Sequence, residues 1–192
     1  MKQEFASQVF DLEKMKQALT PQVFKKFMRT VDQKNALDSE VADSLARAIK
    51  QWAEAMGVTH FTHWFMPLTG LTAGKQNTFL EYDGHGRIIS RFSGRDLVKG
   101  EPDASSFPHG GMRSTFEARG YTAWDPCSPV FIVKSRKNSV LFIPSVFYGF
   151  NGCVLDKKTP LLRSLKLIND TSLKILAKFN QRAVWVKNMI GA

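Results

Sequence analysis

Residues 38–65, DSEVADSLARAIKQWAEAMGVTHFTHWF, predict a complete helix followed directly by a strand. Asp38 can cap the helix, and Glu40 lies near its positive N-terminal end. Gly57 then ends the helix. Residues 58–65 are rich in β-branched and aromatic side chains, which favour a strand. The apolar residues at helical spacing before Gly57 indicate a core-facing helix; they are Val41, Leu45, Ala48, Ile49, Trp52 and Met56.

Flanking segments extend this pattern in both directions. Residues 5–19 predict a short helix or an arm, and Thr20-Pro21 opens a helix that ends before Asp32. Thr159-Pro160 opens another helix with many leucines on one side. Short β-rich runs separated by turn residues lie between the helices. These runs are 78–82 and 87–92, then 130–133, 140–143 and 147–150. The sum is an α+β fold, a mostly antiparallel sheet flanked by helices.

The composition narrows the function classes. The 192-residue chain has a formal net charge of +10, and residues 156–192 supply +6 of it through eight Lys or Arg against two Asp. Zinc-finger spacing and an aromatic RNA-binding signature are both lacking, so we expect no nucleic-acid partner. No apolar run reaches the roughly 18 residues of a membrane span, and the N-terminus does not read as a signal peptide. Cys127 and Cys153 suggest reduced thiols, so we expect a cytoplasmic protein that does not bind membranes.

Residues 100–129, GEPDASSFPHGGMRSTFEARGYTAWDPCSP, have no helical or strand period and are dense in Gly and Pro. A loop of this length inside a domain usually has a function or is disordered. Its aromatic residues favour order, because such side chains seek burial. They are Phe107, Phe116, Tyr121 and Trp124. We interpret the stretch as an ordered, function-bearing segment.

Familiar catalytic motifs are missing from the sequence. A G-x-S-x-G elbow and Gly-rich phosphate loops are absent, so Ser105 and Ser106 are interpreted first as turn or cap residues. His60 and His63, three residues apart on a strand, point to opposite faces and are not expected to share a metal. Asp103, after a proline and before small residues, can hold a cation or orient an amine. The residues alone therefore predict an accessory site of unknown ligand.

Three runs resemble the N-terminal region of type III glutamine synthetases, ATP-dependent ligases that join ammonia to glutamate. They are HFTHWFMPLTGLTA (60–73), FSGRDLVKGEPDASSFPHGGMRSTFEARGYTAWDPCSPVFI (92–132) and LDKKTPLLRSL (155–165), and the likeness extends from about residue 9 to 179. The resemblance implies a helical segment over 1–57, a β-grasp-like domain over 58–155 with a long functional loop at 93–129, and a C-terminal helix and truncated tail over 156–192.

The resemblance also implies a site and a partner. By position, Asp103 is similar to the family's acid-loop Asp, which serves the ammonium site across a subunit interface, with Glu101, Ser105 and Ser106 as loop support. The partner is a catalytic-barrel subunit or a homo-oligomer. Without that neighbour, aromatic residues such as Trp64, Phe107 or Trp124 are expected to be partly exposed. No cofactor or metal is expected to bind within this chain, whereas the complete enzyme uses ATP and Mg or Mn, with glutamate and ammonium as substrates.

Departures from the family pattern leave two hypotheses open. Met66 replaces the Gln of HWFQP, residues 72–77 differ from TAEKHD, and residues 180–192 contain no Glu. The first hypothesis is an N-terminal portion of a synthetase, inactive alone, which exists as a split-gene subunit, a truncated product or a fragment. The alternative is a non-catalytic module that binds and regulates an intact glutamine synthetase oligomer.

Overall fold

A curled sheet lies against a layer of helices in the computed structural model, which describes residues 7–33, 37–68, 70–102, 120–135 and 138–186. The helices are α1 (Leu12–Ala18), α2 (Pro21–Gln33), α3 (Ser39–Ala55), α4 (Gly94–Val98) and α6 (Lys158–Lys178). The strands are β1 (His60–Phe65), β2 (Ala73–Thr78), β3 (Leu80–Tyr82), β4 (Ile88–Ser90), β5 (Lys99–Gly100), β6 (Gly120–Trp124), β7 (Phe131–Lys134) and β8 (Ser139–Gly149).

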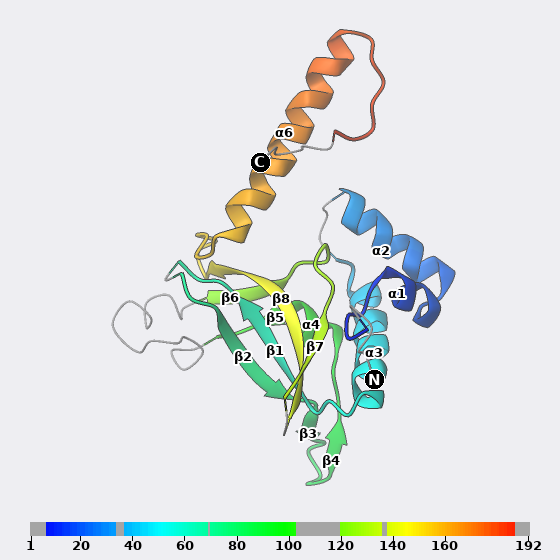
Figure 1. Ribbon diagram of the computed structural model, residues 1–192, viewed down its shortest axis with the longest axis vertical. Helices are drawn as coiled ribbons and strands as arrows, with labels where there is room; N and C mark the ends of the chain where they lie inside the picture. Colours follow the sequence, from blue (N-terminus) through cyan, green and yellow to red (C-terminus); the bar gives the residue numbers. More distant parts are fainter. Residues whose placement is uncertain (1–6, 34–36, 69, 103–119, 136–137, 187–192) are drawn as a thin grey trace.

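The long strand β8 organises the sheet, whose order is β2-β1-β8-β6-β5 with β7 also paired to β8 (Figure 1). The first half of β8 pairs with β1 and β7, and the second half pairs with β6. Only the β1–β8 pairing is parallel among these strands, and β3 and β4 form a separate antiparallel hairpin. Helices combined with a mostly antiparallel sheet confirm the predicted α+β class.

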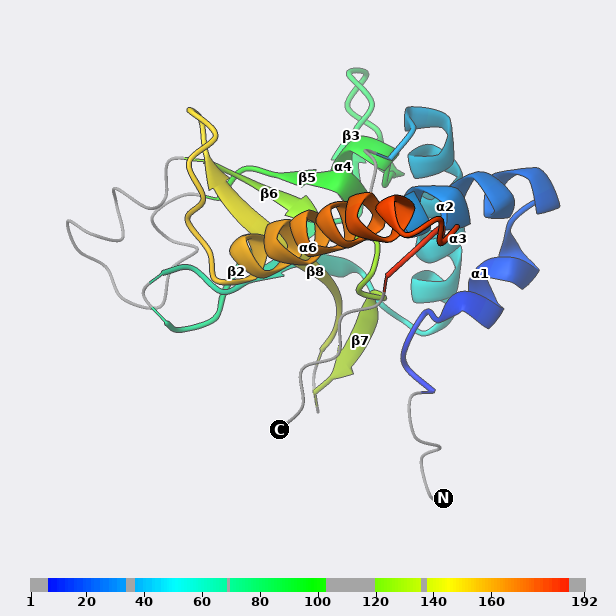
Figure 2. The same cartoon turned by 90° about the horizontal axis from the view of Figure 1, so that it is seen from above.

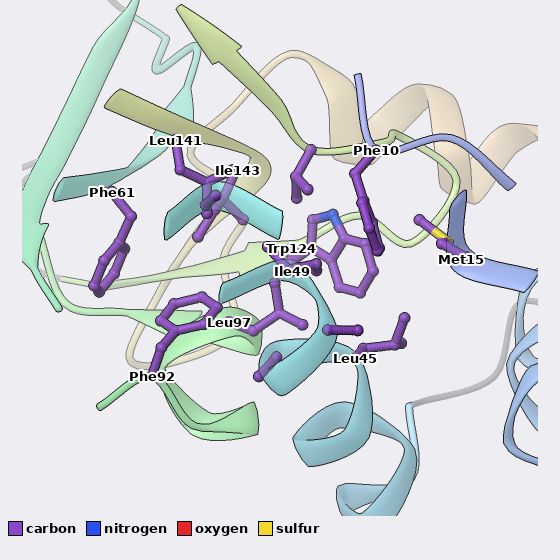
Figure 3. Close-up of a cluster of buried hydrophobic side chains, with 14 of the residues drawn as sticks. Phe10, Met15, Leu45, Ile49, Phe61, Phe92, Leu97, Trp124, Leu141 and Ile143 are labelled. Atoms are coloured by element: carbon purple, nitrogen blue, oxygen red, sulfur yellow. The ribbon is translucent and has the colours of Figure 1, made fainter. Parts of the chain in front are cut away.

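Helix α3 supplies most of the helical side of the core. The Asp38 side chain accepts hydrogen bonds from the backbone N–H groups of Glu40 and Val41, as expected for a helix cap. Figure 3 shows Leu45 and Ile49 of α3 in one cluster with Leu141 and Ile143 of β8. The helix therefore packs across the centre of the sheet, and its cap and apolar spacing agree with the sequence prediction.

Trp124 belongs to this core, which corrects the expectation that it is partly exposed. Its side chain is only 4% exposed, and its ring stacks on Phe27 of α2 with ring centroids 6.2 Å apart. The indole N–H donates to the carbonyl of Ser128 at 3.0 Å. Trp64 is half-buried against Phe131, and Phe107 lies outside the described residues. Trp124 therefore packs the end of β6 against the helical layer.

Regular structure also occurs where the sequence suggested loops. Residues 94–98, 99–100 and 120–124, all inside the predicted loop 93–129, form α4, β5 and β6. Residues 73–78, which include all but Thr72 of the divergent segment 72–77, form β2. Each strand exists through pairing with β1, β6 or β8, and none has the alternating apolar pattern that predicts a strand from its own residues.

Helix α6 extends away from the sheet (Figure 1), and in the view from above it lies in front of the sheet (Figure 2). The buried carboxylate of Asp156 accepts hydrogen bonds from the Phe147 N–H at 2.6 Å and the Thr159 N–H at 2.9 Å, so it joins β8 to the first turn of α6. Several apolar residues of this helix are nevertheless solvent-exposed: Leu161, Ile168 and Phe179 of the predicted apolar side, together with Leu167 and Ile175. Within the described part of the chain, none of the helices combines the length and apolar character that crossing a membrane requires.

Candidate functional site

The chain around the predicted acid loop is described on both sides of it. Glu101 is exposed, and its carboxylate lies 3.7 Å from Lys99 Nζ. Asp103, Ser105 and Ser106 lie outside the described residues. The structure therefore describes the residues that precede and follow the segment with Asp103, at 101–102 and from 120 onward.

The two ends of that segment are fixed on neighbouring strands. Strand β5 pairs antiparallel with β6, with Lys99 opposite Ala123 and Gly100 opposite Thr122. Lys99 Nζ also lies 3.5 Å from the centroid of the Tyr121 ring, a cation–π contact across the pair. The chain thus leaves β5 at Glu101 and enters the neighbouring strand β6 at Gly120.

Close packing explains the glycine at position 100. A Cβ there would overlap Thr122 Oγ1 and would lie 2.9 Å from the His63 ring atoms Cγ and Cδ2. Only a residue without a side chain lets β5 lie this close to β1 and β6. Gly100 therefore fixes the position from which Glu101 and Pro102 continue.

Helix α4 holds the preceding residues against α3. Ser93 and Asp96 form a reciprocal capping box at its start. The Gly94 N–H donates to the Asp43 carboxylate at 2.7 Å, and a Cβ on Gly94 would lie 2.6 Å from the Asp43 backbone nitrogen. The short helix is thus stabilised by tertiary contact, and the approach to Glu101 is anchored to the core.

His63 of β1 connects α4 to the sheet. Its ring is 2% exposed, with Nε2 2.8 Å from the Asp96 carbonyl oxygen and Nδ1 3.1 Å from Ser145 Oγ. Burial lowers the pKa of His63 to about 4, although the Asp96 carbonyl and carboxylate act in the opposite direction. The imidazole is therefore neutral at pH 7, and its Nε2–H donates to the Asp96 carbonyl.

A cavity of about 340 Å³ opens beside Glu101. Phe61 and His63 of β1 line it, together with side chains of β2, β3, α4 and β5. Lys75, Arg91, Arg95 and Lys99 place four cationic groups around it, and Glu81, Asp96 and Glu101 place three carboxylates. Sequence reasoning missed this site, because its charges come from separate segments that only the fold brings together.

Among the described residues, no group of three or more His, Cys, Asp or Glu side chains is placed to hold a metal ion. His60 is exposed, and its Nδ1 is 2.7 Å from Thr59 Oγ1. His63, in contrast, is buried against α4. The two histidines therefore have separate surroundings.

Comparison with known proteins gives consistent relatives. The family model described as "Glutamine synthetase type III N terminal" matches residues 1–164. A protein named "Type-3 glutamine synthetase" from Dictyostelium discoideum is 42% identical over 189 residues, which cover 97% of this chain and 26% of that protein. A "Glutamine synthetase" from Bacteroides fragilis (strain YCH46) is 43% identical over 187 residues, which cover 97% of this chain and 25% of that protein. The chain thus spans about a quarter of the length of these curated relatives.

Proposed function

Because this chain belongs to the glutamine synthetase type III N-terminal family, we propose that it acts as the N-terminal portion of such an enzyme and completes an ammonium site with Asp103. In this proposal, a β-grasp-like unit over residues 58–155 meets a catalytic barrel of another subunit in an oligomer. The units 1–57 and 156–192 flank it as helical segments. The barrel binds ATP, a divalent metal and glutamate, and the reaction takes place in the cytoplasm.

The observation that carries the proposal is the close similarity to the two relatives over nearly the whole chain. The framework around Glu101 adds a physical reason. A segment whose ends are held on the adjacent strands β5 and β6 loses less conformational freedom when it docks than a free tail does. Within that segment, a carboxylate favours ammonium by charge and helps to remove its proton before attack on the activated glutamate.

Asp103 has a specific chemical task in this proposal. Ammonium is not a nucleophile until it loses a proton, and an acceptor beside it must be ionised at neutral pH. An ionised Asp carboxylate meets that requirement. Glu101, held near Lys99, is assigned a supporting role at the start of the loop, and Ser105 and Ser106 are assigned supporting roles within it.

Complementation tests the proposal. The chain is mixed with a form of the Bacteroides fragilis relative that lacks the aligned segment, and glutamine formation from glutamate, ammonium and ATP is measured with Mg²⁺. We expect a complex by size-exclusion chromatography and turnover well above that of either polypeptide alone. Absence of a complex together with unchanged turnover would overturn the proposal. A change in the turnover of the intact relative, without complementation, would favour the regulatory alternative instead.

A further inference from the structure

The cavity beside Glu101 collects positive charge from four parts of the chain. Lys75 comes from β2, Arg91 from the link after β4, Arg95 from α4 and Lys99 from β5. Among the described residues that line the opening, four cations face three carboxylates. Cations that converge on one concave site raise the local concentration of anions.

The carboxylates around the cavity do not neutralise these cations equally. Asp96 is held in the capping box by the Ser93 N–H at 2.8 Å and the Ser93 hydroxyl at 2.6 Å. Glu81 lies 3.6 Å from Arg91, and Glu101 lies 3.7 Å from Lys99. Both separations exceed the usual hydrogen-bond distance, so an incoming oxyanion can displace these pairs at small cost.

Arg95 is the cation most available to a ligand. Its side chain lines the cavity, is exposed, and forms no ion pair with any described residue. A guanidinium is always charged and presents paired N–H donors that match a phosphate or carboxylate. Its paired N–H donors can therefore bind an anion, because no acidic side chain among the described residues forms an ion pair with them.

Three lining residues, Phe61, His63 and Gly100, contribute no charge to the cavity. Both ring nitrogens of His63 already face partners, the Asp96 carbonyl and Ser145 Oγ, and Phe61 is apolar. Gly100 adds no side chain. A volume of about 340 Å³ suits a small molecule, within the range of roughly 300–1,000 Å³ typical of ligand pockets.

We propose that this cavity binds a small oxyanion with two negative charges, a phosphate or a short dicarboxylate, held by Arg95 and Arg91 with Lys75 and Lys99. An anion that takes Lys99 competes with Glu101, two residues before Asp103. Occupancy of the cavity thereby alters the start of the acid loop. The site lies within this chain, so it does not rest on the function proposed above.

Isothermal titration of the 192-residue chain tests this inference. Sodium phosphate and sodium glutarate are titrated separately at pH 7.5 and constant ionic strength, with sodium chloride as the blank. We expect saturable 1:1 binding of at least one of the two anions with millimolar affinity or better. Phosphate alone identifies a phosphoryl ligand, and glutarate alone identifies a dicarboxylate.

Matched variants locate the binding. Arg95→Gln is expected to weaken it by about tenfold, the effect of losing one charge-assisted contact. Arg29→Gln removes the same charge from the exposed surface of α2, away from the cavity, and is expected to leave the affinity unchanged. In the unmodified chain, the NMR shifts caused by the anion should concentrate at residues 93–101 and Lys75. Absence of saturable heat with both anions, or equal weakening by the two Arg variants, would overturn the inference.

Discussion

His63 is a buried, neutral imidazole that joins β1 to the end of α4. Its folded-state pKa of about 4 lies below the ordinary value of 6.5, so the unfolded state binds the proton more readily. The stability that this residue contributes is therefore complete above about pH 6.5 and is lost as the pH falls toward 4.

We predict a loss of about 2 kcal/mol of unfolding free energy from this residue between pH 7 and pH 5. Urea unfolding at the two pH values measures it. The difference should become much smaller in His63→Gln and stay unchanged in His60→Gln, because His60 is exposed. A pH dependence that persists fully in His63→Gln would show that other groups cause it.

At the scale of single elements, Asp156 couples β8 to α6. Replacing it by Ala removes the carboxylate that accepts hydrogen bonds from the Phe147 N–H and from Thr159. We expect a loss of about 3 kcal/mol of unfolding free energy, measured by urea unfolding. Asp170→Ala removes an exposed carboxylate that pairs with Lys166 on the same helix and should change stability little. Equal effects of the two variants would contradict the assigned role of Asp156.

Elements with local signals were predictable from sequence, and those stabilised by distant partners were not. Asp38 and the apolar spacing after it define α3 within one segment. Strand β2 has the sequence AGKQNT, and it is a strand because β1 lies beside it. Likewise, Gly94 marks α4 only through its contact with α3. The burial of Trp124 depends on Phe27, nearly one hundred residues away in the chain.

The candidate site follows the same division. A run of residues as specific as GEPDASS allows Asp103 and Glu101 to be singled out by resemblance. The cationic cavity was not predictable, because Lys75, Arg91, Arg95 and Lys99 show no common motif in sequence. Pairing of β1 with β2, and packing of α4 on α3, bring them around one opening.

At the scale of the whole molecule, the apolar residues exposed on α6 predict self-association of the isolated chain. Ile168 and Ile175 are seven residues apart on one side of this helix and are about half exposed. We expect light scattering to increase with protein concentration, and the increase should be smaller in the double variant Ile168→Lys with Ile175→Lys. Ile88→Lys on β4 is the control for added charge. A monomer at every concentration would contradict this expectation.

The proposal as a whole depends on Asp103 acting at an ammonium site rather than only capping a turn. Asp103→Asn preserves the shape and the capping ability of the side chain but removes its charge. Asp170→Asn on the exposed side of α6 is the matched control.

The decisive measurement is an ammonium titration of glutamine formation in the complemented assembly. We predict that Asp103→Asn leaves the complex intact while turnover falls by at least about tenfold, as expected from loss of a proton acceptor. The apparent affinity for ammonium should weaken as well, and Asp170→Asn should behave as the unmodified chain. Unchanged turnover and unchanged ammonium affinity in Asp103→Asn would contradict the proposed function of this residue.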